Sequence, residues 1–211
     1  MATLPELHSK WYVRLGLPVA RVFFRVLLFF LGPLIVRGSR NVPRTGPLLI
    51  FANHLSYIDA VVAQLACPRP IYFLAKADMF EIKGVGRIMR MAKAIPIEPM
   101  TPDRDALDKA IALLRAGYAV CVFPEGGTNH TGKLAPLKPG LALIVKMALP
   151  AVIGLGLRDT NRMLPDGEYV LRPAFRRVLA LWGKPKSFAR DASRAEIMAW
   201  TEAELHRLAN C

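Results

Sequence analysis

The segment Asn53-His54-Leu55-Ser56-Tyr57-Ile58-Asp59 holds the two side chains of this chain that are best suited to proton transfer. It follows a short apolar run at 47–52, and α/β folds place reactive groups just outside the ends of their strands. An imidazole that donates one ring N–H to a carboxylate is held in a single tautomer, and its other nitrogen can then act as a base. His54 and Asp59 are therefore the candidate catalytic pair.

The five-residue separation of His54 and Asp59 restricts how the two side chains can meet. On one continuous helix five residues turn about 500°, so the side chains would leave from different faces. The two can meet if His54 lies on the loop and Asp59 lies in the first turns of the helix that follows. The spacing also permits a plain capping arrangement, in which Asn53 caps the helix and His54 is an exposed loop residue.

No protein nucleophile accompanies this pair. Ser56 is close in sequence, but no strained nucleophile elbow surrounds it. A histidine and an aspartate without a nucleophile suit direct transfer, in which a hydroxyl of the substrate itself attacks. We expect no metal, because none of the four histidines has ligand spacing with cysteines or acids. They are His8, His54, His130 and His206.

A second candidate segment, Phe123-Pro124-Glu125-Gly126-Gly127-Thr128, follows another apolar run at 118–123. Its paired glycines would let backbone N–H groups approach a ligand closely, and Glu125 could accept hydrogen bonds from substrate hydroxyls. A basic loop at 133–140, which includes Lys138, leads into the next predicted helix and is suited to binding an anion. The alternative interpretation is an ordinary glycine-rich turn after a strand.

From residue 47 onward short apolar runs alternate with amphipathic segments, which predicts an α/β sheet with helices on its faces. The predicted strands lie at 47–52, 71–75, 94–97, 118–123, 151–157 and 178–182. The predicted helices lie at 56–66, 81–91, 101–117 and 141–148. A terminal helix follows Ser193, which forms a capping box with Glu196.

The first forty residues differ from the rest, and we expect residues 1–40 to form a hydrophobic, amphipathic helical segment that anchors the chain to a membrane. The apolar run covers only 26–36 and contains a Gly-Pro pair, whereas a membrane-spanning helix needs about 20 apolar residues. Extending the run backward would bury arginines at roughly 2.5–3.5 kcal/mol each. These arginines are Arg14, Arg21 and Arg25.

An interfacial helix or broken helical hairpin, with its arginines at the lipid phosphates, therefore fits the first forty residues best. A true membrane span and an ordinary buried helix are the alternatives. The remaining residues, 41–211, would form the domain that carries the candidate site. No internal repeat and no long linker divides this part of the chain.

Composition favours an anionic membrane surface over nucleic acid as a partner. The chain has 29 basic and 16 acidic residues, a net charge of +13 and a hydrophobic fraction of 53%. Proteins that lie on anionic lipid are both basic and hydrophobic, and no DNA- or RNA-binding motif is visible. These values exclude a disordered chain, although a basic soluble protein with a large core would share them.

Three widely spaced cysteines argue against a disulfide scaffold and favour a cytosol-facing protein.

Together, the two segments resemble signature blocks of the phospholipid/glycerol acyltransferase family, which includes the lysophosphatidic acid acyltransferases. Asn53 and His54 with Asp59 match the family's NHxxxxD signature, and residues 123–126 match its FPEG block. The resemblance runs over about 36–186, and two blocks in the right order are far more specific than either alone. Two further stretches resemble the blocks that follow, 132–140 and 149–153.

The resemblance implies an α/β fold with a mixed, mostly parallel sheet covered by helices, and O-acyl transfer at the cytoplasmic face of a membrane. The acyl donor would be a thioester of coenzyme A or acyl carrier protein, with no other cofactor. The expected acceptor is the free hydroxyl of a lysophospholipid, namely 1-acyl-glycerol-3-phosphate (lysophosphatidic acid), which would give phosphatidic acid. His54 would be the base and Asp59 would orient it. The residues expected to bind substrate are Asn53, Lys93, Glu125, Gly126, Gly127, Thr128 and Lys138.

Two departures from the family pattern concern the acceptor's phosphate. The family's second block usually ends in an arginine, which is absent from 95–99, and its third block usually continues with threonine and arginine, where Gly127 and Thr128 stand here. Loss of two bidentate phosphate donors should matter for a free phosphomonoester. Either the acceptor is another lysolipid, such as one whose phosphate carries a head group, or other cations replace the arginines. Candidates are Arg87, Arg90, Lys93, Lys133 and Lys138.

A non-catalytic, basic membrane-binding protein that keeps the fold is the alternative from a different functional class. The intact pair of His54 and Asp59 argues against it.

Overall fold

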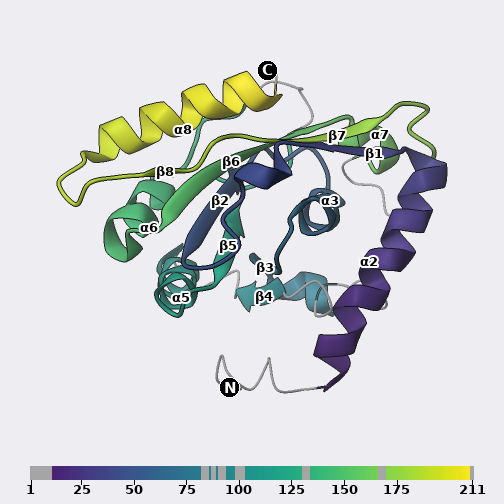
Figure 1. The fold of residues 1–211 in the computed structure, drawn as a ribbon, viewed down its shortest axis with the longest axis horizontal. Helices are drawn as coiled ribbons and strands as arrows, with labels where there is room; N and C mark the ends of the chain where they lie inside the picture. Colours follow the sequence, from purple (N-terminus) through teal and green to yellow (C-terminus); the bar gives the residue numbers. More distant parts are fainter. Residues whose placement is uncertain are drawn as a thin grey trace.

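The apolar runs of the sequence form a single mixed sheet in the computed structural model, which describes residues 11–81, 86, 89, 94–97, 103–129, 134–165 and 170–209 (Figure 1). Its strands are β1 (Leu34–Arg37), β2 (Leu48–Ala52), β3 (Ile71–Lys76), β4 (Ala94–Ile97), β5 (Ala119–Val122), β6 (Ala151–Arg158), β7 (Val178–Trp182) and β8 (Lys186–Ser187). The helices are α2 (Trp11–Leu31), α3 (Asp59–Ala66), α5 (Asp103–Arg115), α6 (Gly140–Ala148), α7 (Thr160–Met163) and α8 (Arg194–Ala209), with short 3-10 helices η1 (Ser39–Asn41) and η2 (Ala77–Phe80).

The order of strands across the sheet is β1-β7-β6-β2-β5-β3-β4, and β8 pairs with β6. Neighbouring strands run parallel except where β7 and β8 meet β6. The expected mixed, mostly parallel sheet is thus confirmed. Helical crossovers between parallel strands place helices on both faces of such a sheet, which requires strands that are apolar on both sides.

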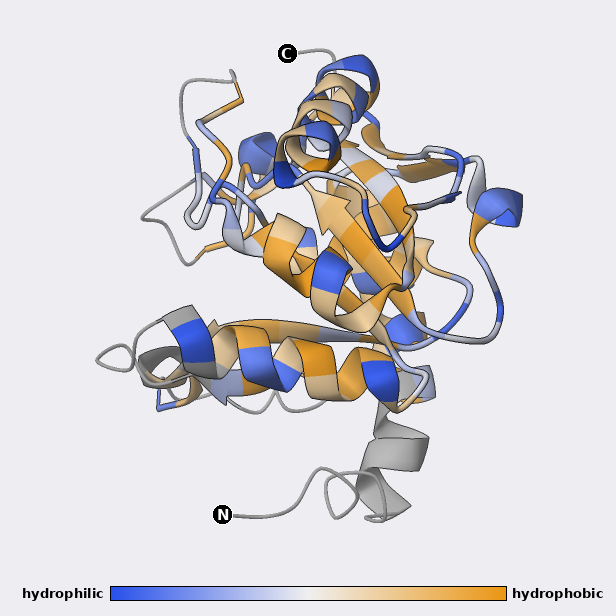
Figure 2. Cartoon of the chain, turned by 90° about the vertical axis from the view of Figure 1, so that its left-hand side faces the viewer, coloured by the Kyte–Doolittle hydropathy of each residue, from blue (hydrophilic) through white to orange (hydrophobic). Residues whose placement is uncertain are grey.

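Strand β2 shows this two-sided burial, because all five of its residues are fully buried. Leu48, Ile50 and Ala52 belong to the core on the side of α2 and α3. Leu49 and Phe51 belong to the core beneath α5, α6 and α8. In Figure 2 the strands are hydrophobic along their length, whereas the covering helices alternate hydrophobic and hydrophilic bands. The continuous apolar run in the sequence therefore marks the centre of the sheet.

The pairing of β2 with β5 brings the two predicted site segments to the same edge of the sheet. The strands are parallel neighbours, and Phe51 is aligned with Val122. The chain leaves β2 into the loop at 53–58 and leaves β5 into the loop at 123–129. The carboxyl ends of adjacent parallel strands lie side by side, so these two loops meet.

Helix α2 packs beside α3 through Leu28, which is 1% exposed, and through the guanidinium of Arg21. Arg21 Nη2 donates hydrogen bonds to the carbonyls of Gln64 at 2.8 Å and Cys67 at 2.7 Å, at the C-terminal end of α3. A cation at this position satisfies orphan carbonyls and complements the helix dipole. Burial lowers the pKa of Arg21. The expectation that this arginine reaches lipid phosphates is wrong, because its hydrogen bonds are to the protein.

Several elements differ from the sequence prediction. Strand β1 falls within the predicted 1–40 segment, yet it pairs with β7 along its whole length. Strand β8 and helix α7 were not expected.

The predicted helix at 81–91 lies almost entirely outside the described residues. At the start of α8, the backbone N–H of Glu196 donates to Ser193 Oγ at 3.0 Å, as the capping box predicts.

Replacing Arg21 by leucine should loosen α2 from the domain while the sheet stays folded. The change removes two hydrogen bonds and leaves carbonyls at the end of α3 without their donor, at a cost of about 1–3 kcal/mol. Hydrogen exchange of the α2 amides, followed by mass spectrometry of the detergent-solubilised chain, should then become about tenfold faster. Arg25→Leu is the matched control, since Arg25 is exposed one turn further along. Unchanged exchange in α2 of Arg21→Leu would contradict the anchoring role.

Candidate active site

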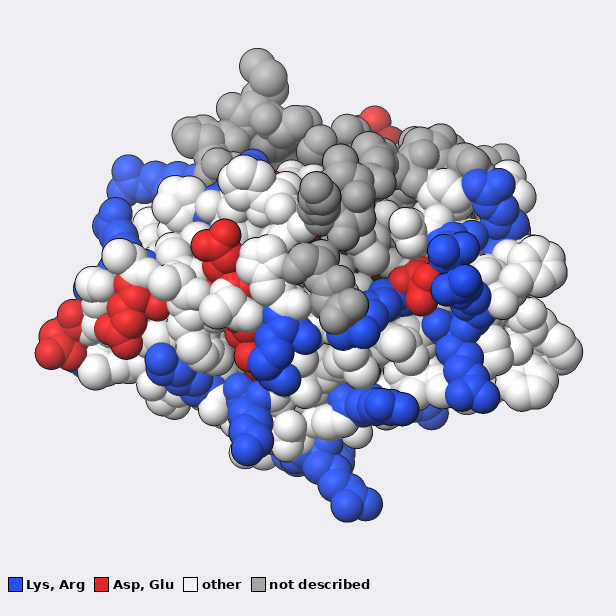
Figure 3. Space-filling view, turned by 90° about the horizontal axis from the view of Figure 1, so that it is seen from above, with Lys and Arg blue, Asp and Glu red and all other residues white. Residues whose placement is uncertain are grey.

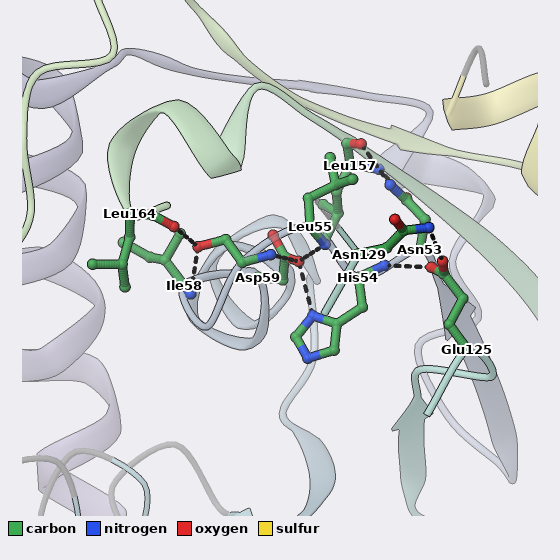
Figure 4. A network of polar contacts seen from close by, with 10 residues as sticks. Asn53, His54, Leu55, Ile58, Asp59, Glu125, Asn129, Leu157 and Leu164 are labelled. Carbon is green, nitrogen blue, oxygen red and sulfur yellow. Dashed lines mark hydrogen bonds and ion pairs between the residues drawn. The ribbon is translucent and has the colours of Figure 1, made fainter. Parts of the chain in front are cut away.

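His54 and Asp59 meet at the start of α3, beyond the carboxyl end of β2 (Figure 4). The imidazole Nδ1 lies 3.0 Å from Asp59 Oδ2. Asp59 is the first residue of α3 and its side chain is 0% exposed, whereas His54 lies on the loop and is 16% exposed. The structure therefore shows the loop-and-first-turn geometry that the five-residue spacing allows, and not capping of α3 by Asn53.

The same oxygen of Asp59 also holds the loop backbone. Oδ2 accepts hydrogen bonds from the N–H of Leu55 at 2.6 Å and the N–H of Ser56 at 2.8 Å. Ser56 is held in turn, because its hydroxyl donates to the carbonyl of Leu164 at 2.5 Å. The other oxygen, Oδ1, is buried and has no hydrogen-bond partner among the described residues. Three donors on one oxygen fix the carboxylate and the loop relative to each other.

With Nδ1–H donated to Asp59, the lone pair of the His54 ring lies on Nε2, which points away from the carboxylate (Figure 4). In this tautomer Nε2 can accept a proton from a substrate hydroxyl. The carboxylate compensates the positive charge that the ring gains when it does so. The arrangement is a base held in one orientation, with the carboxylate on the side opposite the reacting atom.

The imidazole ring also lies against an aromatic column. His54 stacks on Phe123 with the ring centroids 4.0 Å apart and the planes 17° apart. Phe123 in turn stacks on Phe73 of β3, with centroids 6.3 Å apart. Stacking restrains the ring rotation that the hydrogen bond to Asp59 alone would permit.

Glu125 joins the loop after β5 to the loop after β2. Its Oε1 accepts a hydrogen bond from the backbone N–H of His54 at 2.8 Å. Its Oε2 accepts from Asn129 Nδ2 at 3.2 Å and from the N–H of Ala135 at 2.9 Å, while the Asn129 N–H donates to the His54 carbonyl at 2.8 Å. The carboxylate therefore positions the backbone that carries the imidazole. Contact between Glu125 and a substrate hydroxyl stays a prediction.

Asn53 is 3% exposed, and its side chain pairs with β6 (Figure 4). Nδ2 donates to the carbonyl of Leu157 at 2.9 Å, and Oδ1 accepts from the Leu157 N–H at 2.7 Å. The side chain thus extends the β2–β6 pairing beyond its last aligned pair, Ala52 with Leu155. This double hydrogen bond sets the direction in which the chain leaves β2, immediately before His54.

The turn at 126–128 brings Lys138 close to the site. Gly126 has a φ of 79°, in the left-handed region that favours glycine, and the flexible end of the Lys138 side chain lies over its α-carbon. The backbone N–H of Lys138 donates to the carbonyl of Pro124 at 2.8 Å, which fastens this loop to the turn. Gly127 is exposed with open space around it, and Thr128 is half-buried.

Of the cations predicted to hold a phosphate, Lys138 is described and is exposed. The others lie outside the described residues, namely Arg87, Arg90, Lys93 and Lys133. Among the residues that the structure describes, no three or more His, Cys, Asp or Glu side chains are grouped so as to hold a metal ion.

Two contacts were not predicted. Phe123 stacks on the imidazole because it comes directly after β5, and β5 is the neighbour of β2. Predicting this contact would require knowing the order of the strands in the sheet. The side chain and backbone of Asn129 hold Glu125 and His54, and no local pattern in the sequence marks this residue.

The acyltransferase family model matches residues 33–158, which is more than half of the chain and includes both loops of the site. The chain belongs to the acyltransferase family. The dyad of His54 and Asp59 and the loop with Glu125 both lie within the matched region.

This member of the family is 28% identical over 169 residues to the chloroplastic 1-acyl-sn-glycerol-3-phosphate acyltransferase BAT2 of Brassica napus, covering 77% of this chain and 49% of that protein. It is 24% identical over 188 residues to the 1-acyl-sn-glycerol-3-phosphate acyltransferase of Bacillus subtilis, covering 87% of this chain and 90% of that one. The chain spans about half the length of the plant relatives that it matches.

The acyltransferase fold is also similar to the crystal structure of PlsC, the 1-acyl-sn-glycerophosphate (LPA) acyltransferase from Thermotoga maritima. The TM-score is 0.77 over 94% of this chain and 80% of that chain, at 23% sequence identity. At this identity the likeness establishes the fold, which agrees with the mixed sheet covered by helices described above.

Glu125→Gln tests whether this carboxylate positions His54. A glutamine offers one acceptor oxygen and an NH2 group, so at least one of the three present donors would face another donor. We expect the kcat of acyl transfer to fall by about 10- to 100-fold with little change in KM, because small displacements of a reacting group reduce the rate by such factors. Glu196→Gln, an exposed change in α8, is the control. A higher KM for the acceptor at unchanged kcat would instead favour direct substrate binding by Glu125.

Proposed function

We propose that this chain is an O-acyltransferase that moves a fatty acyl group from an acyl thioester to the free hydroxyl of lysophosphatidic acid, giving phosphatidic acid. The observation that carries the proposal is the imidazole of His54, held on Nδ1 by a buried carboxylate and directing Nε2 away from it. The names of its relatives from Brassica napus and Bacillus subtilis support the choice of acceptor.

In the proposed reaction, Nε2 of His54 takes the proton from the acceptor's hydroxyl as its oxygen attacks the thioester carbonyl carbon. Asp59 stabilises the imidazolium that forms, through the hydrogen bond from Nδ1. When the tetrahedral intermediate collapses, the carbon–sulfur bond breaks and the imidazolium returns the proton to the departing thiolate. Coenzyme A or acyl carrier protein leaves as a free thiol, and nothing stays attached to the protein.

The turn at 126–128 and Lys138 are proposed to bind the acceptor beside the imidazole. Gly127 has open space around its α-carbon, so a ligand can approach the backbone closely. The exposed Lys138 side chain crosses Gly126 and would supply a positive charge for the phosphate. Asn53 acts here by positioning His54, since both polar atoms of its side chain bond to β6. Phosphate binding by Lys93 and the other cations stays a prediction.

Within the described part of the chain, no helix is both long enough and apolar enough to cross a bilayer. Helix α2 nevertheless carries a face of exposed apolar side chains, each more than half exposed: Val19, Val22, Phe23, Val26, Phe29 and Phe30. We place this face on the surface of an anionic membrane, at its cytoplasmic side. Its rings would enter the interface, and the net charge of +13 would draw the protein to anionic lipid.

His54→Ala tests the proposed base. We expect acyl transfer to lysophosphatidic acid to fall by about 10²–10⁴-fold, which is the usual contribution of general base catalysis. Formation of phosphatidic acid from acyl-coenzyme A and from acyl carrier protein thioester, measured by mass spectrometry, provides the readout. His206→Ala, an exposed histidine on α8, is the matched control and should retain activity.

A panel of lysolipids decides the acceptor in the same assay. Preference for lysophosphatidic acid would mean that cations of this chain replace the two arginines of the family pattern. Preference for a head-group-bearing lysophospholipid would move the assignment to that acceptor. Equal activity of wild-type protein and His54→Ala with every acceptor would contradict the mechanism.

A further inference from the structure

Phe175 is exposed in a way that the packing of the domain does not explain. Its side chain is 92% exposed, the largest value among the large apolar residues that the structure describes. Its backbone has a φ of 53°, in the left-handed region, where a residue with a side chain is strained. A strained backbone that directs an aromatic ring into water indicates a surface that contacts something else.

The backbone on both sides of Phe175 is fastened to the C-terminal end of α2. Ala174 is buried, and its N–H donates to the carbonyl of Leu31 at 2.6 Å. A Cβ built on Gly32 would lie 3.2 Å from both the Ala174 side chain and the carbonyl of Arg176, so the two segments are in close contact. The backbone that carries the Phe175 ring is therefore held beside the C-terminal end of α2.

This contact joins Phe175 to the exposed face of α2. Phe29 and Phe30, in the last turn of that helix, are 68% and 75% exposed. Three exposed phenyl rings from two parts of the chain are thus carried by backbone that meets at the C-terminal end of α2. We call them, together with the arginines of the loop at 170–177, the α2–loop surface. These arginines are Arg172, Arg176 and Arg177, and all three are exposed.

The charge around the α2–loop surface is positive. Arg37 of β1, the strand that follows α2, is also exposed. Seen from above, Lys and Arg side chains gather at the end of the molecule where α2 lies, beside uncharged side chains that project from its edge (Figure 3). Asp159, an acidic residue described at this end, is bonded to Arg162 at 2.8 Å; residues 166–169 lie outside the described ranges. Projecting rings among arginines match an anionic lipid surface, in which rings enter the interface and guanidinium groups meet phosphates.

We propose that the loop at 170–177 is a second membrane-binding element, which inserts Phe175 into the surface of an anionic bilayer beside α2. The proposal rests on the membrane association proposed above and extends it to a segment far away in sequence. A single interfacial helix can still roll about its axis on a membrane. A second contact beside its C-terminal end removes that freedom and sets how the catalytic domain faces the lipid.

A fluorescent label on the loop tests the insertion directly. Bimane is attached to full-length Phe175→Cys, Phe30→Cys and Met147→Cys, the last an exposed control on α6, all in a Cys211→Ser background. Burial raises the pKa of the Cys67 thiol and raises that of Cys121 further, so both stay protonated and react slowly. On vesicles of phosphatidylcholine and phosphatidylglycerol, nitroxide lipids should quench the labels at 175 and 30 but not the label at 147.

The outcomes separate this proposal from the one on which it rests. Quenching at 30 without quenching at 175 would overturn the second element and leave the docking of α2 intact. No quenching at either position would overturn membrane association through this surface altogether.

Two sets of variants measure what the loop contributes to binding. Phe175→Gly relieves the left-handed strain, so its thermal midpoint should match or exceed that of wild type while its binding to the vesicles weakens. Arg176→Gln with Arg177→Gln should weaken binding by about 30-fold. The matched control, Arg190→Gln with Arg194→Gln, changes one exposed arginine just before α8 and one at its first residue, at the opposite side of Figure 1 from α2. Wild-type affinity in Phe175→Gly, or equal affinities of the two double variants, would overturn the proposal.

Discussion

One carboxylate oxygen, Asp59 Oδ2, organises the site, because it binds the imidazole of His54 and the backbone of the loop between them at once. A carboxylate held only by the ring could rotate away from it. Here the N–H groups of Leu55 and Ser56 also hold the oxygen, so the ring donates to an acceptor whose position the loop backbone sets. Since the residue is fully buried, water cannot compete for these contacts. The proton-accepting nitrogen is therefore oriented by the folding of a single turn.

The sheet supplies the supports that a single turn cannot. Strand β2 lies between β6 and β5, so each neighbour reaches the segment that leaves it. From β6, Leu157 holds the amide of Asn53, and from the loop after β5, Glu125 holds the N–H of His54. Phe123 then lies flat against the imidazole. The dyad is thus braced from both sides of its strand, and the Nε2 edge of the ring is the part left to meet a substrate.

Much of the fold follows from local patterns, because strands buried on both faces are continuous apolar runs, as in β2, β5 and β6. The meeting of His54 and Asp59 is also local. Their spacing allowed the loop-and-first-turn arrangement but equally allowed capping by Asn53, and the match to the NHxxxxD signature favoured the pair. The roles of Arg21 and β1 could not be predicted in this way. An apolar segment with arginines can lie on lipid or pack against the protein, and its sequence does not distinguish the two. The carbonyls that bind Arg21 lie more than forty residues away along the chain. The contacts of Glu125 likewise depend on which strands are neighbours, and periodicity does not encode that order.

The tautomer of His54 tests the central claim most directly. Long-range ¹H–¹⁵N correlation spectra of the ¹⁵N-histidine-labelled protein in detergent, with His54 assigned by the spectrum of His54→Gln, report which ring nitrogen carries the proton. The account predicts a protonated Nδ1 and an unprotonated Nε2 for neutral His54, and loss of this preference in Asp59→Asn. A ring protonated at Nε2 in the wild type, or a spectrum unchanged by Asp59→Asn, would contradict it.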